Sequence, residues 1–406
     1  MSGPSSRAAL PRVLLVVAQY HPVVGGVEKQ AQRLAEGLVR RGLAVSVLTG
    51  RPPGTPRREV IGGVPVRRLT YLAEWKFGPA KFHVQVLAAL AEMWQRRESY
   101  DLIHVHQAHW LAFAGILAGQ RLKKPCVVTV HNTAARFDLR VLGRFLPGGA
   151  WMGRYIACNA DRFVAISRAI AEELRAWGVN ENRIVYISNG VPIPARWEAD
   201  KAPARRALGL PEHGFLILFV GSLRTHKRPD VALAAFRLLH REVPEARMIF
   251  LGDGPMRCSL ARQAALLPGG AVIWAGQVMN VTEYLVAADA LVLPSDVEGL
   301  PLALLEGMAH GLACVGTVVP GIVELLRHGE TGFLVPPRDA VALADALRTL
   351  ARDRSLCVRL GNNARDFVRG HFDLEAVLVE HIRLYQHLVA AEKRGAATSC
   401  HVVGQV

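Results

Sequence analysis

The sequence predicts an α/β protein with two doubly wound, Rossmann-like domains, each a parallel sheet with helices on both faces. Three observations favour this fold class. The chain has 406 residues, more than the ~250–300 that one hydrophobic core usually serves. Short β-branched runs alternate with amphipathic helical segments from end to end, as in βαβ units. A stretch rich in proline, alanine and charge, at residues 191–211, separates two halves that each show this alternation.

In the first half, runs rich in valine and isoleucine predict strands, because β-branched side chains pack well on a pleated surface. These strands are expected at residues 12–18, 45–49, 64–69, 101–106, 126–131, 162–166 and 184–187. Apolar residues at helical spacing predict helices at residues 27–41 and 80–97. Together these elements indicate a first domain over residues 1–195.

The alternation restarts in the second half. Strands are expected at residues 215–220, 247–251, 272–275, 290–294 and 314–316, with helices at 230–241, 255–266, 281–287, 302–310, 340–352, 356–369 and 374–392. We assign residues 196–372 to a second domain, and 373–406 to a C-terminal helix that returns to the first domain and ends in a disordered tail. Because ligands of open parallel sheets bind at the carboxyl ends of the strands, we expect a ligand cleft between the domains.

Composition excludes several classes of protein. With 51% hydrophobic and 20% charged residues the chain is not disordered, and no apolar run reaches the ~18 residues of a membrane-spanning helix. The first 12 residues are expected to be a disordered tip rather than a secretory signal, so we expect a cytoplasmic protein. The six cysteines form no C-x-x-C pair, and His104 and His106 share a strand face without an acidic residue. We therefore expect neither disulfides nor a metal site.

The net charge of +15 is distributed unevenly. Residues 1–200 hold 27 Lys and Arg against 14 Asp and Glu, a surplus of 13, whereas the second half is almost neutral. A basic half beside a neutral half suggests that one domain meets an anionic partner such as nucleic acid, a phospholipid surface or a phosphorylated substrate. The alternative is that the arginine content reflects only the composition of the source proteome.

Residues 294–311 are the most informative segment for function. They leave an expected strand and open a helix with Pro301 near its first position, where a missing N–H costs little. The free amides and positive end of that helix form an anion site suited to a diphosphate. Glu306 lies about one turn inside the helix on an apolar face, where a carboxylate normally binds hydroxyls or amides. An ordinary solvated glutamate is the simpler alternative.

Glu298 and Glu306, with seven residues between them, resemble the E-x7-E signature of the family 4 glycosyltransferases, which are retaining enzymes of GT-B architecture. Further motifs follow in that family's order over almost the whole chain. They are Gly25-Gly26-Val27-Glu28, Val130-His131-Asn132, Ser188-Asn189-Gly190-Val191, the run from Phe219 to Asp230, Gly252-Asp253-Gly254-Pro255, Glu324 and the run from Thr331 to Pro337. One such motif is a weak signal, whereas the ordered set is a strong one.

The resemblance implies transfer of a hexose-type sugar from a UDP- or GDP-linked donor with retention of configuration. It assigns catalysis to three residues, with Lys227 at the diphosphate and Glu298 and His131 at the donor sugar. It assigns donor binding to Gly25, Gly26, Arg224, Arg228, Gly252, Gly276, Gln277, Val278, Gly299, Leu300, Leu302 and Glu306. No D-x-D motif is present, so we expect no metal and no other cofactor. Positive side chains and helix amides would then stabilise the leaving diphosphate, and Glu298 would not act as a covalent nucleophile.

Three positions depart from the family pattern. Ser222 stands where the family often has an arginine beside the phosphates, and Pro301 removes one amide from the donor loop. Pro320-Gly321 replaces the usual Gly-Gly before Glu324. With Ser222, either Arg224 or Arg228 compensates or charge neutralisation rests mainly on Lys227. The residues after Pro301 can still donate, and Pro320-Gly321 bears on that loop's contact with the sugar.

The first domain is expected to bind the acceptor. Arginines interleave with bulky apolar residues at positions 136–155, and residues 71–97 combine aromatic and basic side chains. Lipid-modifying members of the family have basic amphipathic membrane contacts in this domain. We therefore hypothesise that it docks on anionic lipid at the inner face of the cell membrane and receives a lipid-linked or polysaccharide acceptor. In the alternative interpretation the apolar residues are core and the arginines a solvated face.

The nearest alternative function is a sugar-nucleotide epimerase or a phosphorylase of similar paired-domain fold. An oxidoreductase is disfavoured because no G-x-G-x-x-G follows the first strand. A nucleic-acid-binding protein is disfavoured because no recognition signature is present. The sequence leaves open the donor base and sugar, the acceptor and linkage, and the oligomeric state.

Overall fold

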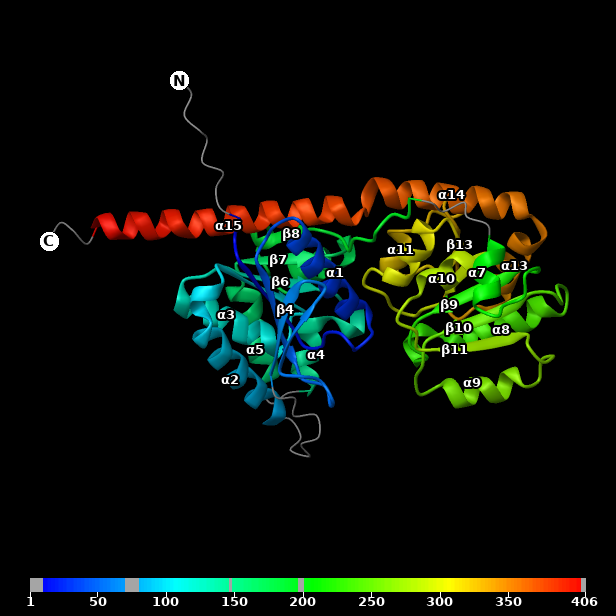
Figure 1. Cartoon of the computed structure of the whole chain (residues 1–406), viewed down its shortest axis with the longest axis horizontal. Helices are drawn as coiled ribbons and strands as arrows, with labels where there is room; N and C mark the ends of the chain where they lie inside the picture. Colours follow the sequence, from blue (N-terminus) through cyan, green and yellow to red (C-terminus); the bar gives the residue numbers. More distant parts are fainter. Residues whose placement is uncertain (1–9, 70–79, 146–147, 196–200, 403–406) are drawn as a thin grey trace, which may run out of the picture. The chain divides into compact units, whose positions relative to one another are not determined.

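The computed structural model describes residues 10–69, 80–145, 148–195 and 201–402. It confirms the α/β class, with two separate sheets that are almost wholly parallel. The chain divides into two compact units (Figure 1). Unit 1 comprises residues 1–188 and 375–406, and unit 2 comprises residues 189–374. The predicted disordered tip lies largely at residues 1–9, outside the described residues. The predicted disordered tail is wrong over most of its length, because the last helix continues from residue 392 to Val402.

The sheet of unit 1 has eight strands in the order β3-β4-β2-β1-β5-β6-β7-β8. All neighbours are parallel except β3, which runs antiparallel to β4. Every residue of the central strands β1, β5 and β6 is buried, as the continuous apolar runs predict. The bounds are β1 (Val13–Val17), β2 (Val45–Gly50), β3 (Arg58–Ile61), β4 (Val64–Leu69), β5 (Leu102–His106), β6 (Cys126–Val130), β7 (Arg162–Ala165) and β8 (Ile184–Tyr186).

The described helices of unit 1 lie mainly between these strands. They are α1 (Gly26–Arg40), α2 (Ala80–Gln95), α3 (Trp110–Leu122), α4 (Asp138–Phe145), α5 (Gly149–Asn159), α6 (Arg168–Ala176) and α15 (Leu374–Val402), with short 3-10 turns η1 (Arg97–Ser99), η2 (Ala134–Arg136) and η3 (Glu181–Arg183). Helix α3 packs on β5 and β6 and contacts both α2 and α5. Among the described residues, no helix is long and apolar enough to cross a membrane.

The C-terminal helix α15 packs on unit 1 through buried side chains. Tyr385 is fully buried, and Leu378 lies against α1 so closely that a Cβ at Gly37 would be 2.5 Å from its Cδ1. Arg41 donates from Nη2 to Glu375 at 2.6 Å near the start of α15. Residues from the end of the sequence therefore complete the core of the unit that begins it (Figure 1).

Unit 2 has six parallel strands in the order β11-β10-β9-β12-β13-β14. Its strands are β9 (Leu216–Val220), β10 (Arg247–Leu251), β11 (Val272–Gly276), β12 (Ala290–Leu293), β13 (Ala313–Thr317) and β14 (Phe333–Val335). Its helices are α7 (Lys201–Ala207), α8 (Pro229–His240), α9 (Arg257–Ala264), α10 (Thr282–Ala287), α11 (Leu302–Ala309), α12 (Pro320–Val323), α13 (Ala340–Arg352) and α14 (Arg354–His371), with the 3-10 turn η4 (Thr225–Lys227). Phenylalanines on β9, α8 and β10 fill a core that α13 and α14 extend.

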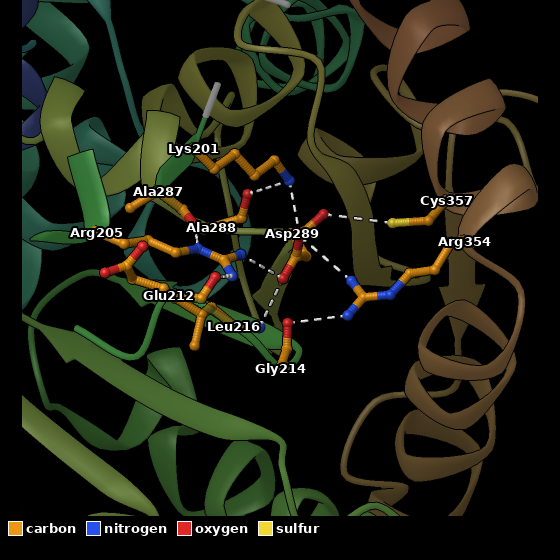
Figure 2. Close-up of polar contacts among 10 residues, drawn as sticks. All are labelled: Lys201, Arg205, Glu212, Gly214, Leu216, Ala287, Ala288, Asp289, Arg354 and Cys357. Carbon is orange, nitrogen blue, oxygen red and sulfur yellow. Dashed lines mark hydrogen bonds and ion pairs between the residues drawn. The ribbon is translucent and has the colours of Figure 1, made fainter. Parts of the chain in front are cut away.

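A buried carboxylate, Asp289, fastens several of these elements (Figure 2). Its Oδ2 accepts from the Leu216 amide and from Arg205 Nη2, both at 2.8 Å, and its Oδ1 accepts from Lys201 Nζ at 2.7 Å. Arg354, at the start of α14, lies 3.3 Å from the same Oδ1. Burial raises the pKa of Asp289, but Lys201, the Leu216 amide and Arg205 outweigh it and lower the pKa overall. The ionised form is therefore the one this site favours.

This network involves the stretch at residues 191–211 that separates the two halves of the sequence, where no helix was predicted. Helix α7 lies inside that stretch, and Arg205 and Lys201 hold it to unit 2 by also donating to the carbonyls of Ala287 and Ala288. The helix was not predicted because proline, alanine and arginine are typical of linkers, whereas here the basic side chains meet a buried acid far away in sequence. Residues 196–200 lie outside the described residues.

Candidate functional site

Three loops at the carboxyl edge of the unit 2 sheet are joined backbone to backbone. The Gly252 amide, after β10, donates to the Gly276 carbonyl at 2.7 Å, and the Leu223 amide, after β9, donates to the Asp253 carbonyl at 2.9 Å. Gly252 has φ +136°, and a Cβ there would lie 2.0 Å from the Gly221 carbonyl oxygen. Only glycine allows this approach. Gly252 and Gly276 therefore lie together, as a shared binding site requires.

Lys227 and Glu298 form an ion pair at the same edge. Lys227 ends the turn η4 that follows β9, and Glu298 lies in the loop between β12 and α11. Lys227 Nζ donates to both carboxylate oxygens of Glu298, at 2.6 and 2.9 Å, and Ser295 Oγ donates to Oε1 at 2.6 Å. Glu298 is only 7% exposed. Two of the three predicted catalytic residues are thus in direct contact.

The loop after Glu298 is supported from two sides. Asn189 Nδ2 donates to the Leu300 carbonyl at 3.0 Å. A Cβ at Gly321 would lie 2.5 Å from the Gly299 carbonyl oxygen, so the glycine of the unusual Pro320-Gly321 pair sits against this loop. Pro301 is the N-cap of α11, with φ −74° and ψ 116°, and the helix begins at Leu302. The missing amide of Pro301 therefore precedes the first helical turn.

The other predicted donor-binding residues of unit 2 differ in their surroundings. Glu306 is 6% exposed on α11. Arg224 is exposed, whereas Arg228 donates from Nη2 to Asp230 at 2.7 Å. Gln277 is exposed and Val278 half-buried, directly after Gly276. Arg228 is thus already engaged within the protein, and Arg224 is the more accessible of the two arginines.

Gly25 and Gly26, in unit 1, mark the start of α1 after β1. Gly25 is the N-cap in extended backbone, and its carbonyl accepts from the Lys29 amide at 3.0 Å. A Cβ at Gly25 would lie 2.2 Å from Glu28 Oε2, whereas one at Gly26 would meet nothing within 4 Å. Burial raises the pKa of Glu28. The atom that crowds Gly25 therefore belongs to Glu28, a residue of the same glycine-rich motif.

His131 follows β6 in unit 1 and is 7% exposed. Its amide donates to Asp138 Oδ2 at 3.4 Å, and its Nε2 lies 3.1 Å from His106 Nδ1. Burial lowers the pKa of His131 to about 3, so its ring is neutral near pH 7. A neutral imidazole here can donate or accept a hydrogen bond but carries no charge.

Asp138, at the start of α4, joins the ends of two strands. Its Oδ2 accepts from the amides of Ala108 and His131, and its Oδ1 accepts from Asn132 Nδ2 at 2.7 Å. Burial raises the pKa of Asp138 to about 6, against the lowering effect of these three donors. The carboxyl thereby holds the backbone on which His131 is placed.

Four residues that support the predicted ones were not singled out from the sequence: His106, Asp138, Asn189 and Ser295. His106, Asp138 and Asn189 reach predicted residues through tertiary folding, whereas Ser295 lies three residues before Glu298 and bonds to it within the same loop. A signal existed for three of them. Asn189 lies in a quoted motif, Ser295 lies in the segment 294–311, and His106 belongs to the His-x-His pair considered as a metal site. Among the described residues, no group of three or more His, Cys, Asp or Glu side chains is arranged to hold a metal ion.

Two family models match the chain, "Glycosyltransferase Family 4" over residues 24–193 and "Glycosyl transferases group 1" over residues 200–367. A D-inositol 3-phosphate glycosyltransferase of Streptomyces avermitilis is 30% identical over 365 residues, which cover 84% of this chain and 78% of that protein. The chain belongs to the family 4 glycosyltransferases. This confirms the predicted family, and with it the class of enzyme.

Other proteins similar to this glycosyltransferase agree with that assignment. The N-acetyl-alpha-D-glucosaminyl L-malate synthase of Bacillus anthracis is 28% identical over 382 residues, covering 92% of this chain and 97% of that one. Among solved structures, sucrose-phosphate synthase of Thermosynechococcus elongatus has TM-score 0.77 at 24% identity, covering 94% and 100% of the two chains. Anabaena HepE in complex with UDP-glucose has TM-score 0.73 at 20% identity, covering 92% and 99%. The structural neighbours confirm the GT-B architecture.

Proposed function

We propose that this glycosyltransferase moves a hexose-type sugar from a UDP- or GDP-linked donor to an acceptor hydroxyl, with retention and without a divalent metal. The contact between Lys227 and Glu298 carries the proposal. It joins a cation suited to a departing diphosphate with a carboxylate suited to the sugar that loses it. The solved structure of HepE with UDP-glucose, on a similar fold, supports a nucleotide-sugar as the donor.

The hydrogen bonds of Glu298 favour a mechanism without a covalent intermediate. Its Oε1 accepts from both Lys227 and Ser295, and its Oε2 accepts from Lys227. Because these donors withdraw electron density from both oxygens, the carboxylate is a poor covalent nucleophile. Attack by the acceptor on the face that the diphosphate leaves, with a diphosphate oxygen taking the proton, would retain configuration without a covalent intermediate.

Metal independence rests on the supply of positive groups at the carboxyl edge of unit 2. Lys227 and exposed Arg224 follow β9, and α11 begins with its free amides after Pro301. A lysine, an arginine and a helix N-terminus together can balance the charge that a divalent ion would otherwise meet. We assign ribose hydroxyls to Glu306, whose burial on α11 suits a carboxylate that binds hydroxyls.

We propose further that the acceptor is anionic. The surplus of 13 positive charges in residues 1–200 favours such a partner. Two relatives point the same way by name, since one acts on D-inositol 3-phosphate and another makes an L-malate glycoside. Two kinds of acceptor would bring negative charge to this domain. One is a lipid-linked or polysaccharide acceptor at an anionic membrane, and the other is a small hydroxylated acid or phosphate. An epimerase would instead change the nucleotide-sugar with no acceptor present.

The test is a transfer assay with EDTA-treated enzyme and a panel of nucleotide-sugars. Its acceptor arms are malate, inositol phosphate and lipid-linked acceptors in vesicles, and the anomeric configuration of the product is read by NMR. We expect metal-free transfer of an α-linked sugar from an α-linked donor. An inverted product, or activity only after addition of Mg²⁺ or Mn²⁺, would contradict the mechanism. Conversion of the donor without an acceptor would favour the epimerase.

A further inference from the structure

A row of buried imidazoles runs behind His131 in unit 1. His104 and His106 project from the same face of β5, and their ring centroids lie 4.7 Å apart. The ring of His106 stacks on that of His131, with centroids 5.3 Å apart and an interplanar angle of 24°. His106 is 1% exposed. The His131 ring is therefore held against a second ring that has almost no contact with solvent.

The far end of the row is closed by hydrogen bonds. His104 Nδ1 lies 2.7 Å from the hydroxyl of Tyr385 on α15, and His104 Nε2 lies 2.7 Å from Thr129 Oγ1 on β6. With both nitrogens engaged, the His104 ring cannot rotate without breaking a bond. His106 therefore packs between one fixed ring and His131.

The backbone also fixes the position of His106. Gln107, the next residue, has φ +77°, a left-handed conformation that a residue other than glycine rarely adopts. Its amide donates to the Thr129 carbonyl at 2.8 Å, which holds the turn to β6. Strained residues of this kind persist where the surrounding structure imposes them, and they cluster at functional sites.

The bond between His106 Nδ1 and His131 Nε2 restricts the proton of His131. Burial lowers the pKa of both rings, so each carries one N–H. In a bond between two neutral rings, one nitrogen donates and the other accepts. The tautomers of the two rings are therefore coupled, because the role of His131 Nδ1 is always the opposite of the role of His131 Nε2. His106 Nε2 is buried without a hydrogen-bond partner among the described residues, and an N–H there would be left unpaired. The arrangement in which His106 Nδ1 donates to His131 Nε2 is therefore favoured, and His131 Nδ1 then carries the N–H offered to a substrate hydroxyl.

We propose that His106 is a positioning residue, which holds the His131 ring in one orientation and one tautomer so that Nδ1 meets the transferred sugar. The inference rests on the proposed contact of His131 with that sugar. Three variants test it. His106→Leu removes the bond, and His106→Asn keeps an amide group where Nδ1 lies. Tyr385→Phe removes only the hydroxyl at the far end of the row and leaves the bond between His104 and Thr129 to hold the His104 ring, so it is a matched control.

The first readout is the ring ¹⁵N signals of His131 in the unliganded enzyme, assigned with a His131→Gln variant. We expect two well-separated ¹⁵N signals, from one tautomer, in the wild type, His106→Asn and Tyr385→Phe. In His106→Leu the two signals should move toward each other as the tautomers interconvert. Separate signals from one tautomer in His106→Leu would overturn the inference, and this readout does not depend on activity.

The second readout is kinetic. We expect His106→Leu to lower kcat by about 10–100-fold, the usual effect of losing a residue that orients a catalytic group, with donor affinity unchanged within about twofold. His106→Asn should recover most of kcat, and Tyr385→Phe should match the wild type. An unchanged kcat in His106→Leu would overturn the positioning role. Full activity in His131→Ala would instead contradict the proposed function of His131 itself.

Discussion

At the scale of single residues, Lys227 has two separable roles, one structural and one chemical. It neutralises Glu298, which is 7% exposed, and it is the cation proposed to meet the leaving diphosphate. Removing one partner of a buried pair typically costs ~3–5 kcal/mol, since the other charge is left without its partner. Lys227 is 22% exposed in its side chain, so the lower part of that range applies.

The two roles predict different behaviour in a single and a double variant. Lys227→Met should lower the free energy of unfolding by about 3 kcal/mol and abolish transfer. Lys227→Met with Glu298→Gln should recover most of the stability, because no buried charge remains, but should stay inactive. Urea unfolding and a transfer assay check this pair. Transfer at the wild-type rate by folded Lys227→Met would remove the diphosphate assignment.

Asp138 predicts an effect of pH on stability. Its pKa in the folded protein is about 6, above the ordinary value of 3.8. Between these values the folded state binds more protons than the unfolded state, so the free energy of unfolding falls as pH rises through this window. From pH 5 to 7.5 the fall due to this one group is about 1 kcal/mol.

An Asp138→Asn variant should lack this fall, because an amide does not titrate. Its oxygen can still accept from the two backbone amides, and Asn132 can turn its own amide to pair with it. Urea titrations give the free energy of unfolding of both proteins at pH 5 and 7.5. The contributions of other titrating groups are the same in both proteins and cancel when the two pH-dependent changes are subtracted. Parallel pH dependence of the two proteins would contradict the assignment of a buried, high-pKa carboxyl.

At the scale of elements, Asp289 joins α7, β9 and α14 (Figure 2). Its lowered pKa means that it stabilises the fold above pH ~4, and that this stability is lost as pH falls through the folded pKa. Asp289→Asn should lower the free energy of unfolding by about 3 kcal/mol at pH 7, since buried Arg205 loses its counter-ion. Its stability should also change less than that of the wild type below pH 4.

Denaturant unfolding at pH 7 and 3.5, for Asp289→Asn and the wild type, checks this prediction. The exposed pair of Arg206 and Glu212 provides a control, because Glu212→Gln should change stability by less than ~1 kcal/mol. Equal stability of Asp289→Asn and the wild type at pH 7 would show that α7 docks by other means.

Most elements could be predicted because their residues carry the pattern locally. The strands of both sheets are β-branched runs, and the predicted and observed bounds of β4 and β10 coincide. The elements that were missed are β3, β14, α3, α4, α5, α6, α7 and α12. Strand β3 has only four residues, with alternating exposure, and the composition of α7 resembles a linker. The residues that hold the predicted site residues in place were missed for a different reason. Asp138 and His106 act on His131 through contacts that only the fold creates.

At the scale of the whole molecule, the charge asymmetry and exposed apolar side chains belong to the same unit. Leu87 and Trp94 on α2 and Trp151 on α5 are 66%, 54% and 61% exposed. Trp151 packs beside Phe113 of α3, and helix α3 also contacts α2. Trp75, Lys76 and Phe77, which belong to the predicted membrane-binding segment 71–97, lie outside the described residues.

These side chains favour the hypothesis that unit 1 meets anionic lipid. Co-sedimentation with vesicles should then be stronger for anionic than for neutral lipid at low salt, and should weaken toward 0.5 M salt as charges are screened. The double variant Leu87→Ser with Trp94→Ser should reduce vesicle binding several-fold. The control is Val358→Ser, which changes an exposed apolar residue on α14 of unit 2. Equal binding to both kinds of vesicle would exclude this role.

The central claim is that the edge of unit 2 binds a nucleotide-sugar diphosphate without metal. Calorimetry and thermal unfolding with UDP, GDP, ADP and their sugars, in EDTA, test it most directly, with Glu306→Ala as the variant expected to bind more weakly. We predict that one nucleotide stabilises the protein selectively, by about 2.7 kcal/mol at a hundred times its dissociation constant. No stabilisation by any member of the panel, with the protein folded, would contradict the account.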